Sequence, residues 1–240
     1  MKPKDFFNLF GKGLKDIYKN FLILVLSILL GFILFIISQF GSALAPRLQT
    51  TISNVIWTIV VGLVSLVLVS YFFAGLIGMA KKTVKGKAKR KDFTLNANKF
   101  WFKNFQIVLI MLAVGILIWG IAHYGAFFIG KAFGLNLNAA LLIFILIYFA
   151  GLVGILIFFT FSSFFLVVND LNVLESVQKS MKFVKKNYLG TLSLSVVFFV
   201  IYFLIDSIEG ILGDALIYAV VLPFVVFVMV RFVLTAGLKK

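Results

Sequence analysis

Long runs of apolar residues without charge are the feature that most constrains this chain. The first run, Phe21–Phe40, holds twenty residues and no charged side chain, which is the length that a helix needs to cross the hydrocarbon core of a bilayer. Such runs recur, so that 62% of the 240 residues are hydrophobic and only 13% are charged. Soluble domains average about 45–50% apolar and 25% charged residues. We therefore expect an integral membrane protein.

The runs predict an all-α fold with six transmembrane helices in a single polytopic domain, residues 1–240. Each predicted span is apolar and long enough to insert as a helix. The six spans are Phe21–Phe40, Val55–Ala80, Asn104–Ala122, Leu141–Leu166, Tyr188–Ile205 and Ile211–Val230.

The positions of the basic residues predict the orientation of these spans. Of the 23 Lys and Arg residues, 21 lie in the N-terminal segment, in residues 81–103, in residues 170–187 or at the C-terminus. Only Arg47 and Lys131 lie in the other three connections. Basic residues are enriched in cytoplasmic connections. We therefore expect a multi-pass protein of the cell membrane with both termini in the cytoplasm.

Two segments have the pattern of helices that lie along a membrane surface. In Asn172–Tyr188, apolar residues follow one helical face and lysines the other, and Asn172 with Glu175 resembles a capping box. The apolar face consists of Leu174, Val177, Met181 and Val184. The N-terminal segment opposes five lysines to a second stripe, Phe6, Phe10, Leu14 and Ile17. Both patterns predict amphipathic helices at the interface.

A short motif recurs where a basic segment meets a span. Lys19-Asn20-Phe21, Lys103-Asn104-Phe105 and Lys186-Asn187-Tyr188 place their asparagines 84 and 83 residues apart. We infer three tandem units, about 1–86, 87–169 and 170–240, each a cytoplasmic surface helix followed by a two-span hairpin. The units share one orientation, which predicts parallel repeats about an axis along the membrane normal. An alternative is that a lysine at the inner edge of a span is common in membrane proteins and recurs by chance.

Two segments resemble a broad family of membrane domains. The residues are Gly86, Asp92 and Phe93 after the second span, and Glu175, Ser176, Ser180, Lys186 and Asn187 before the fifth. They resemble the membrane domain fused to some glycerophosphoryl diester phosphodiesterases and its stand-alone bacterial and archaeal relatives. The resemblance covers nearly the whole chain and implies a polytopic helical domain. It does not imply the phosphodiesterase activity, because the soluble catalytic domain has no counterpart here.

The connection between the second and third spans is the main candidate for binding. It carries seven basic residues, Lys81, Lys82, Lys85, Lys87, Lys89, Arg90 and Lys91, and the later surface helix adds Lys179, Lys182 and Lys186. Each basic residue near an anionic leaflet contributes about 1 kcal/mol. We expect anionic lipid headgroups as partners, with a protein partner or a second copy of the chain as alternatives. Nucleic acid is not expected, because no folded basic platform is predicted. The alternative role of the connection is only to set topology.

The predicted spans offer little for catalysis. The chain has no cysteine and one histidine, and no nucleophile–base pair or metal-ligand set is visible within the spans. We therefore expect no enzyme activity, cofactor or metal. Thr160, Ser162, Ser163 and Arg231 are the candidate residues for an intramembrane polar site. The leading interpretation is a non-enzymatic scaffold or lipid- and partner-binding protein. The alternative is a transporter or channel for a small solute or lipid, in which these polar groups line a path.

Overall fold

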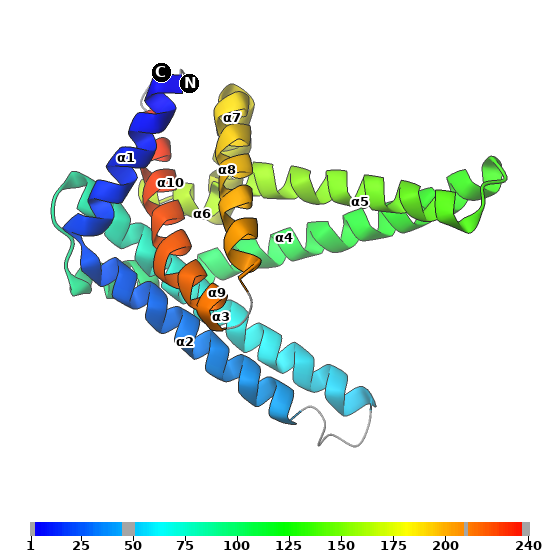
Figure 1. The fold of residues 1–240 in the computed structure, drawn as a ribbon, viewed down its shortest axis with the longest axis horizontal. Helices are drawn as coiled ribbons and strands as arrows, with labels where there is room; N and C mark the ends of the chain where they lie inside the picture. Colours follow the sequence, from blue (N-terminus) through cyan, green and yellow to red (C-terminus); the bar gives the residue numbers. More distant parts are fainter. Residues whose placement is uncertain (1–2, 45–50, 209–210, 237–240) are drawn as a thin grey trace.

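The computed structural model describes residues 3–44, 51–208 and 211–236, and almost all of these residues are helical (Figure 1). Six helical segments are long and apolar enough to cross a membrane, as predicted. The elements are α1 Pro3–Lys19, α2 Phe21–Leu44, α3 Thr51–Lys85, α4 Arg90–Ala132, α5 Leu137–Phe159, α6 Ser162–Asn169, α7 Val173–Lys186, α8 Tyr188–Asp206, α9 Ile211–Leu216, η2 Ile217–Val221 and α10 Leu222–Ala236.

Two of the spanning helices are much longer than predicted. At 1.5 Å per residue, α3 is about 52 Å long and α4 about 64 Å, whereas the hydrocarbon core is about 30 Å thick. The predicted third span, Asn104–Ala122, is only the middle of α4. We expected a surface helix separate from this span, but residues 90–103 continue into it without a break. Asn20 and Asn187, by contrast, each lie at an interruption between two helices.

The predicted fourth span is divided into two helices. We expected one helix over Leu141–Leu166, but α5 ends at Phe159 and α6 begins at Ser162. The Ser180 hydroxyl of α7 donates a hydrogen bond of 2.5 Å to the carbonyl oxygen of Phe158. This contact supplies a partner near the end of α5, where helix carbonyls otherwise lack one.

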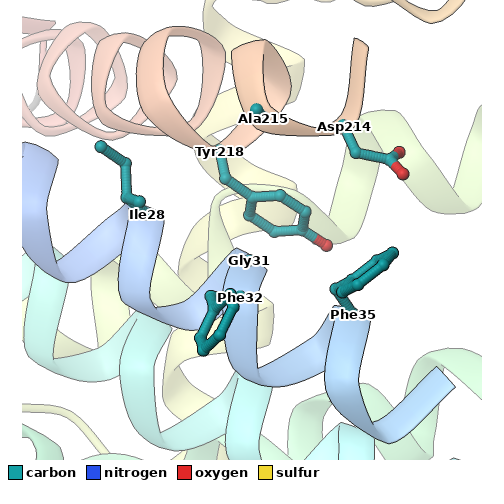
Figure 2. A pocket seen from close by; sticks show the side chains of 7 residues that line it. All are labelled: Ile28, Gly31, Phe32, Phe35, Asp214, Ala215 and Tyr218. Carbon is teal, nitrogen blue, oxygen red and sulfur yellow. The ribbon is translucent and has the colours of Figure 1, made fainter. Parts of the chain in front are cut away.

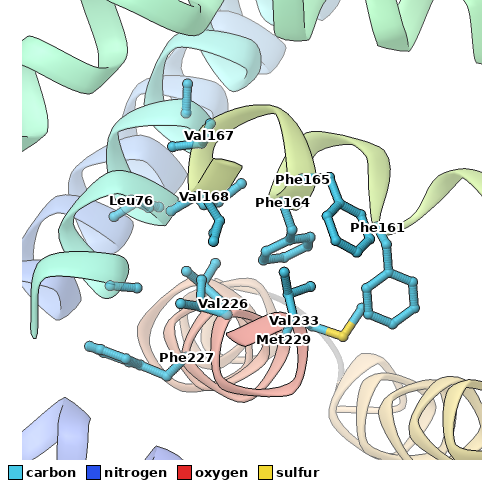
Figure 3. Close-up of a cluster of buried hydrophobic side chains, with 14 of the residues drawn as sticks. Leu76, Phe161, Phe164, Phe165, Val167, Val168, Val226, Phe227, Met229 and Val233 are labelled. Carbon is cyan, nitrogen blue, oxygen red and sulfur yellow. The ribbon is translucent and has the colours of Figure 1, made fainter. Parts of the chain in front are cut away.

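The C-terminal part of α3, together with α6 and α10, forms the core of the molecule. Each of these three helices contacts the other two. Figure 3 shows how Phe161, just before α6, and Phe164 and Phe165 of α6 face Met229 and Val233 of α10, with Leu76 of α3 beside them. All six side chains are buried. From this core the α2–α3 and α4–α5 hairpins extend in different directions (Figure 1).

Three segments with amphipathic sequence each pack against one of the core helices. Helix α1 lies along α10, the start of α4 lies along the end of α3, and α7 lies along α6. The contact is close at Gly13, where an added Cβ would lie 2.8 Å from the Val228 side chain. Helix α1, the α3–α4 connection and α7 lie at one end of the fold, and residues 133–136 lie at the far tip of the α4–α5 hairpin (Figure 1).

Candidate functional site

The basic connection between α3 and α4 is short and is joined to the start of α4 by a hydrogen bond. Helix α3 ends at Lys85 and α4 begins at Arg90. The backbone N–H of Lys89 donates a hydrogen bond of 2.8 Å to the Asp92 carboxylate, so the acidic side chain satisfies a donor at the helix start. Six of the seven predicted basic residues are exposed, namely Lys82, Lys85, Lys87, Lys89, Arg90 and Lys91.

Lys81 differs from the other six basic residues. Its side chain is half-buried, and its ammonium group lies 3.4 Å from the carbonyl oxygen of Val167 in α6. It therefore joins two helices of the core and is less available to a lipid headgroup than its neighbours.

Helix α7 begins as predicted. The Asn172 side chain accepts a hydrogen bond of 2.8 Å from the backbone N–H of Glu175, and the Glu175 carboxylate accepts one of 3.4 Å from that of Asn172. This is a capping box. The predicted binding residues Lys179, Lys182 and Lys186 are exposed, and the Lys179 ammonium lies 5.6 Å from the centre of the Phe165 ring.

The predicted apolar stripe of α7 is divided between the protein and the outside: Val184 is fully buried and Val177 half-buried, whereas Leu174 and Met181 are exposed. Leu174 is 69% exposed and Met181 is 37% exposed. The face that α7 buries against the protein consists of Ser176, Ser180, Phe183 and Val184. Exposed apolar residues flanked by exposed lysines are the composition expected of a helix that lies in the interface of a bilayer.

An ion pair that we did not predict joins α4 to the turn before α7. The Lys99 ammonium donates a hydrogen bond of 2.5 Å to the Asp170 carboxylate. This hydrogen bond lowers the pKa of Asp170 below its ordinary value. Asp170 has φ 55° and forms the left-handed C-cap of α6. Asp170 is the only acidic residue between Asp92 and Glu175, which is the one sequence signal that singles it out.

Among the described residues, no hydrogen bond joins the predicted intramembrane polar residues to one another. The Thr160 hydroxyl donates to the Leu156 carbonyl within its own helix. Ser162 and Ser163 are buried in α6, and the Ser162 hydroxyl has no hydrogen-bond partner among the described residues. Arg231 binds Asp16 of α1 through two nitrogens, one of which, Nη2, lies 2.9 Å from Oδ1. The Arg231 charge therefore forms an ion pair that joins α10 to α1.

The burial of Asp16 was not predicted from the sequence. Its side chain is 0% exposed and that of Arg231 is 16% exposed. We placed the apolar face of the N-terminal helix along Phe10, Leu14 and Ile17, but Leu14 is 48% exposed. The buried face instead follows Leu9, Gly13, Asp16 and Asn20. The side chain of Phe6, the remaining residue of the predicted stripe, lies outside the described residues, as do Arg47, Lys239 and Lys240.

The three recurring asparagines all use their side-chain amide as a donor. Asn20 donates a hydrogen bond of 3.0 Å to the Thr83 hydroxyl, and Asn104 donates one of 3.2 Å to the Ser70 carbonyl. Asn187 donates one of 3.1 Å to the Phe183 carbonyl in the preceding helix. The first two bonds join neighbouring helices, and the third caps α7.

Comparison with known proteins gives one family. A family model described as a domain of unknown function, DUF7847, matches residues 8–239. No curated protein and no solved structure matches the chain.

Proposed function

Because the chain belongs to the DUF7847 family, a domain of unknown function, we propose its role from its geometry: a non-enzymatic membrane protein that binds anionic lipid headgroups through a basic cytoplasmic face. This basic face consists of the exposed residues Lys82, Lys85, Lys87, Lys89, Arg90, Lys91, Lys179, Lys182 and Lys186. The observation that carries the proposal is that the exposed lysines of α7 flank its exposed apolar residues, Leu174 and Met181. The protein would then contact the headgroup of a lipid through its basic residues and the acyl region through its apolar residues.

The proposed orientation places both termini and the basic face in the cytoplasm of a cell. It is supported by the charge distribution, since 21 of the 23 Lys and Arg residues lie in the termini and in residues 81–103 and 170–187. The amphipathic helices α1 and α7 and the start of α4 would lie at the inner membrane surface.

We also propose that the chain consists of three tandem repeats. At separations of 84 and then 83 residues, the same positions are buried or half-buried in α1, α4 and α7 and at the starts of the following spans. The equivalent sets are Leu9, Phe93 and Ser176; Gly13, Ala97 and Ser180; Asp16, Phe100 and Phe183; Asn20, Asn104 and Asn187; and Ile23, Ile107 and Gly190.

The helix contacts support the same division. The start of the second unit packs on the end of the first, and α7 of the third unit packs on α6 of the second. Helix α1 of the first unit packs on α10 of the third, so the three units would close into a ring. Kinship with the membrane domain fused to glycerophosphoryl diester phosphodiesterases stays a proposal that rests on the short motifs alone.

Transport of a small solute is the alternative function. A solute path along the axis that relates the three repeats would run between α3, α6 and α10, where these helices meet. That region contains closely packed Phe, Val, Leu and Met side chains, which are buried (Figure 3). The packing therefore favours lipid or partner binding over a water-lined path.

The proposal is tested with the full chain in nanodiscs that contain mixed anionic and zwitterionic lipids. The preference for spin-labelled phosphatidylglycerol over phosphatidylcholine is measured by electron spin resonance. Replacing the six exposed residues of 82–91 by Gln should reduce that preference at least about threefold at low salt, since each contributes up to about 1 kcal/mol before screening.

The matched control replaces the five lysines among these six residues by Arg, which preserves charge and should preserve the preference. Lys131→Gln, a change of one exposed lysine at the opposite end of the fold, should also leave it unchanged. An unaltered preference in the Gln variant would contradict the proposal.

A further inference from the structure

A cavity of about 220 Å³ lies between α2 and the α9–η2 segment. Figure 2 shows the seven residues that line it, Ile28, Gly31, Phe32, Phe35, Asp214, Ala215 and Tyr218. Six of them are apolar, aromatic or small, and one is a carboxylate. The cavity belongs to neither the basic face nor the buried polar contacts described above.

The shape of the cavity follows from two local features of the chain. Gly31 allows the Tyr218 ring to lie directly against α2, because an added Cβ would come within 2.6 Å of that ring. Tyr218 also lies in the π-helical turn η2, where the N–H of Leu222 bonds to the carbonyl of Ile217. Pro223 follows and has no N–H to offer. Such single π-helical turns occur frequently at functional sites.

The lining has the chemistry of a site for an organic cation. In Figure 2 the Asp214 carboxylate, the Tyr218 ring and the Phe35 ring surround the same end of the cavity. Aromatic faces attract ammonium groups through the negative potential of the ring face, and a carboxylate adds direct charge attraction. Asp214 is exposed and forms no ion pair with any residue that the structure describes.

We propose that this cavity binds the ammonium group of an amphiphile. The cation lies between Asp214, Phe35 and Tyr218, and the apolar part of the molecule extends along Phe32 and Ile28. The cavity opens onto side chains that are exposed on α2, including Phe32, so a chain could enter from the lipid side. An anionic amphiphile would be repelled by the carboxylate.

A second cavity provides an internal comparison. It measures about 540 Å³ and lies between α4 and α5, with Trp119 and Tyr148 among its lining residues. No acidic residue is among the described residues that line it. An apolar chain alone would therefore suit the second cavity, whereas the carboxylate distinguishes the cavity at Asp214.

The test measures binding to the full chain in neutral detergent micelles by isothermal titration calorimetry. The probe is octyltrimethylammonium, and the comparison compound is octyl glucoside, which has the same chain without charge. We expect the cation to bind at least about tenfold more tightly than the glucoside, a difference of about 1.4 kcal/mol.

Asp214→Asn should reduce the affinity for the cation about tenfold, and Phe35→Leu, which retains the carboxylate, several-fold. Asp206→Asn is the matched control, because Asp206 ends the neighbouring helix α8 and does not line the cavity. The thermal midpoint of each variant confirms that it is folded. Equal binding of the two octyl compounds, or equal losses in the Asp214 and Asp206 variants, would overturn the proposal.

Discussion

Asp16 and Arg231 form the interaction with the largest expected effect of a single substitution. The Asp16 side chain is fully buried, and the Arg231 side chain is 16% exposed. Removing one partner leaves an uncompensated buried charge, which costs about 3–5 kcal/mol. We expect Asp16→Asn to lower the free energy of unfolding by about that amount, measured by denaturant unfolding in micelles. Lys19→Gln is the control: Lys19 is 61% exposed and 3.8 Å from Asp16, so its loss should cost less than about 1 kcal/mol.

Replacing both partners distinguishes the cost of an unpaired charge from a loss of packing. A buried ion pair can often be exchanged for apolar residues of similar volume with little loss. The double variant Asp16→Leu with Arg231→Met should therefore recover most of the stability lost in Asp16→Asn. If the double variant were as unstable as the single one, the charge argument would be wrong.

The Lys99–Asp170 pair predicts a pH dependence at acid pH. The hydrogen bond from Lys99 lowers the pKa of Asp170 below 3.8, its ordinary value. A carboxyl whose pKa is lower in the folded state stabilises that state above its unfolded pKa, and the stabilisation is lost as the pH falls through the folded pKa. Wild type should therefore exceed Asp170→Asn in stability at neutral pH, and the difference should shrink below about pH 4. Asn also tolerates the left-handed conformation of residue 170. A difference that stayed constant down to pH 2 would contradict this account.

At the scale of the elements, the break between α5 and α6 depends on α7. The Ser180 hydroxyl is buried and donates to the Phe158 carbonyl. Ser180→Ala should cost about 1 kcal/mol, a typical net value for one hydrogen bond, and should speed amide hydrogen exchange in residues 158–164. Ser193→Ala is the matched control, because that hydroxyl bonds to the Leu189 carbonyl within its own exposed helix turn. Equal exchange in both variants would show that the break does not need α7.

The sequence predicted that the spans are helices and that there are six of them, but it did not predict where each helix begins and ends. Six spans could be predicted because each is a long apolar run, and insertion depends on the run itself. The division at Thr160–Phe161 depends on Ser180, and the orientation of the α7 stripe depends on which face α6 accepts. Neither contact can be read from local periodicity. Residues 90–103 have the same amphipathic character as α1, and nothing local decides whether such a segment continues straight into its span.

Across the whole chain, the exposure of a charged side chain was easier to predict than its partner in an ion pair. The basic residues of 82–91 are exposed because burying an unpaired charge is costly, whichever helix or loop carries it. The Asp16–Arg231 and Lys99–Asp170 pairs join residues 215 and 71 positions apart, and such pairings are fixed only by the tertiary fold. The cavity at Asp214 likewise requires α2 and η2 to meet, although they lie in the first and last spans.

The orientation of the whole chain gives the last prediction. The absence of cysteine allows single cysteines to be introduced at exposed positions, Lys87 and Lys182 for the basic end and Leu135 and Ser207 for the other end. In intact cells an impermeant thiol reagent should label only Leu135→Cys and Ser207→Cys, and all four after lysis. Thr83 and Ser180 are close in sequence to Lys87 and Lys182 but are buried. A cysteine at either position could stay unlabelled on both sides of the membrane and would not report the orientation. Labelling of Lys87→Cys in intact cells would reverse the proposed orientation, and anionic lipids of the cytoplasmic leaflet could then no longer be the partners of the basic face.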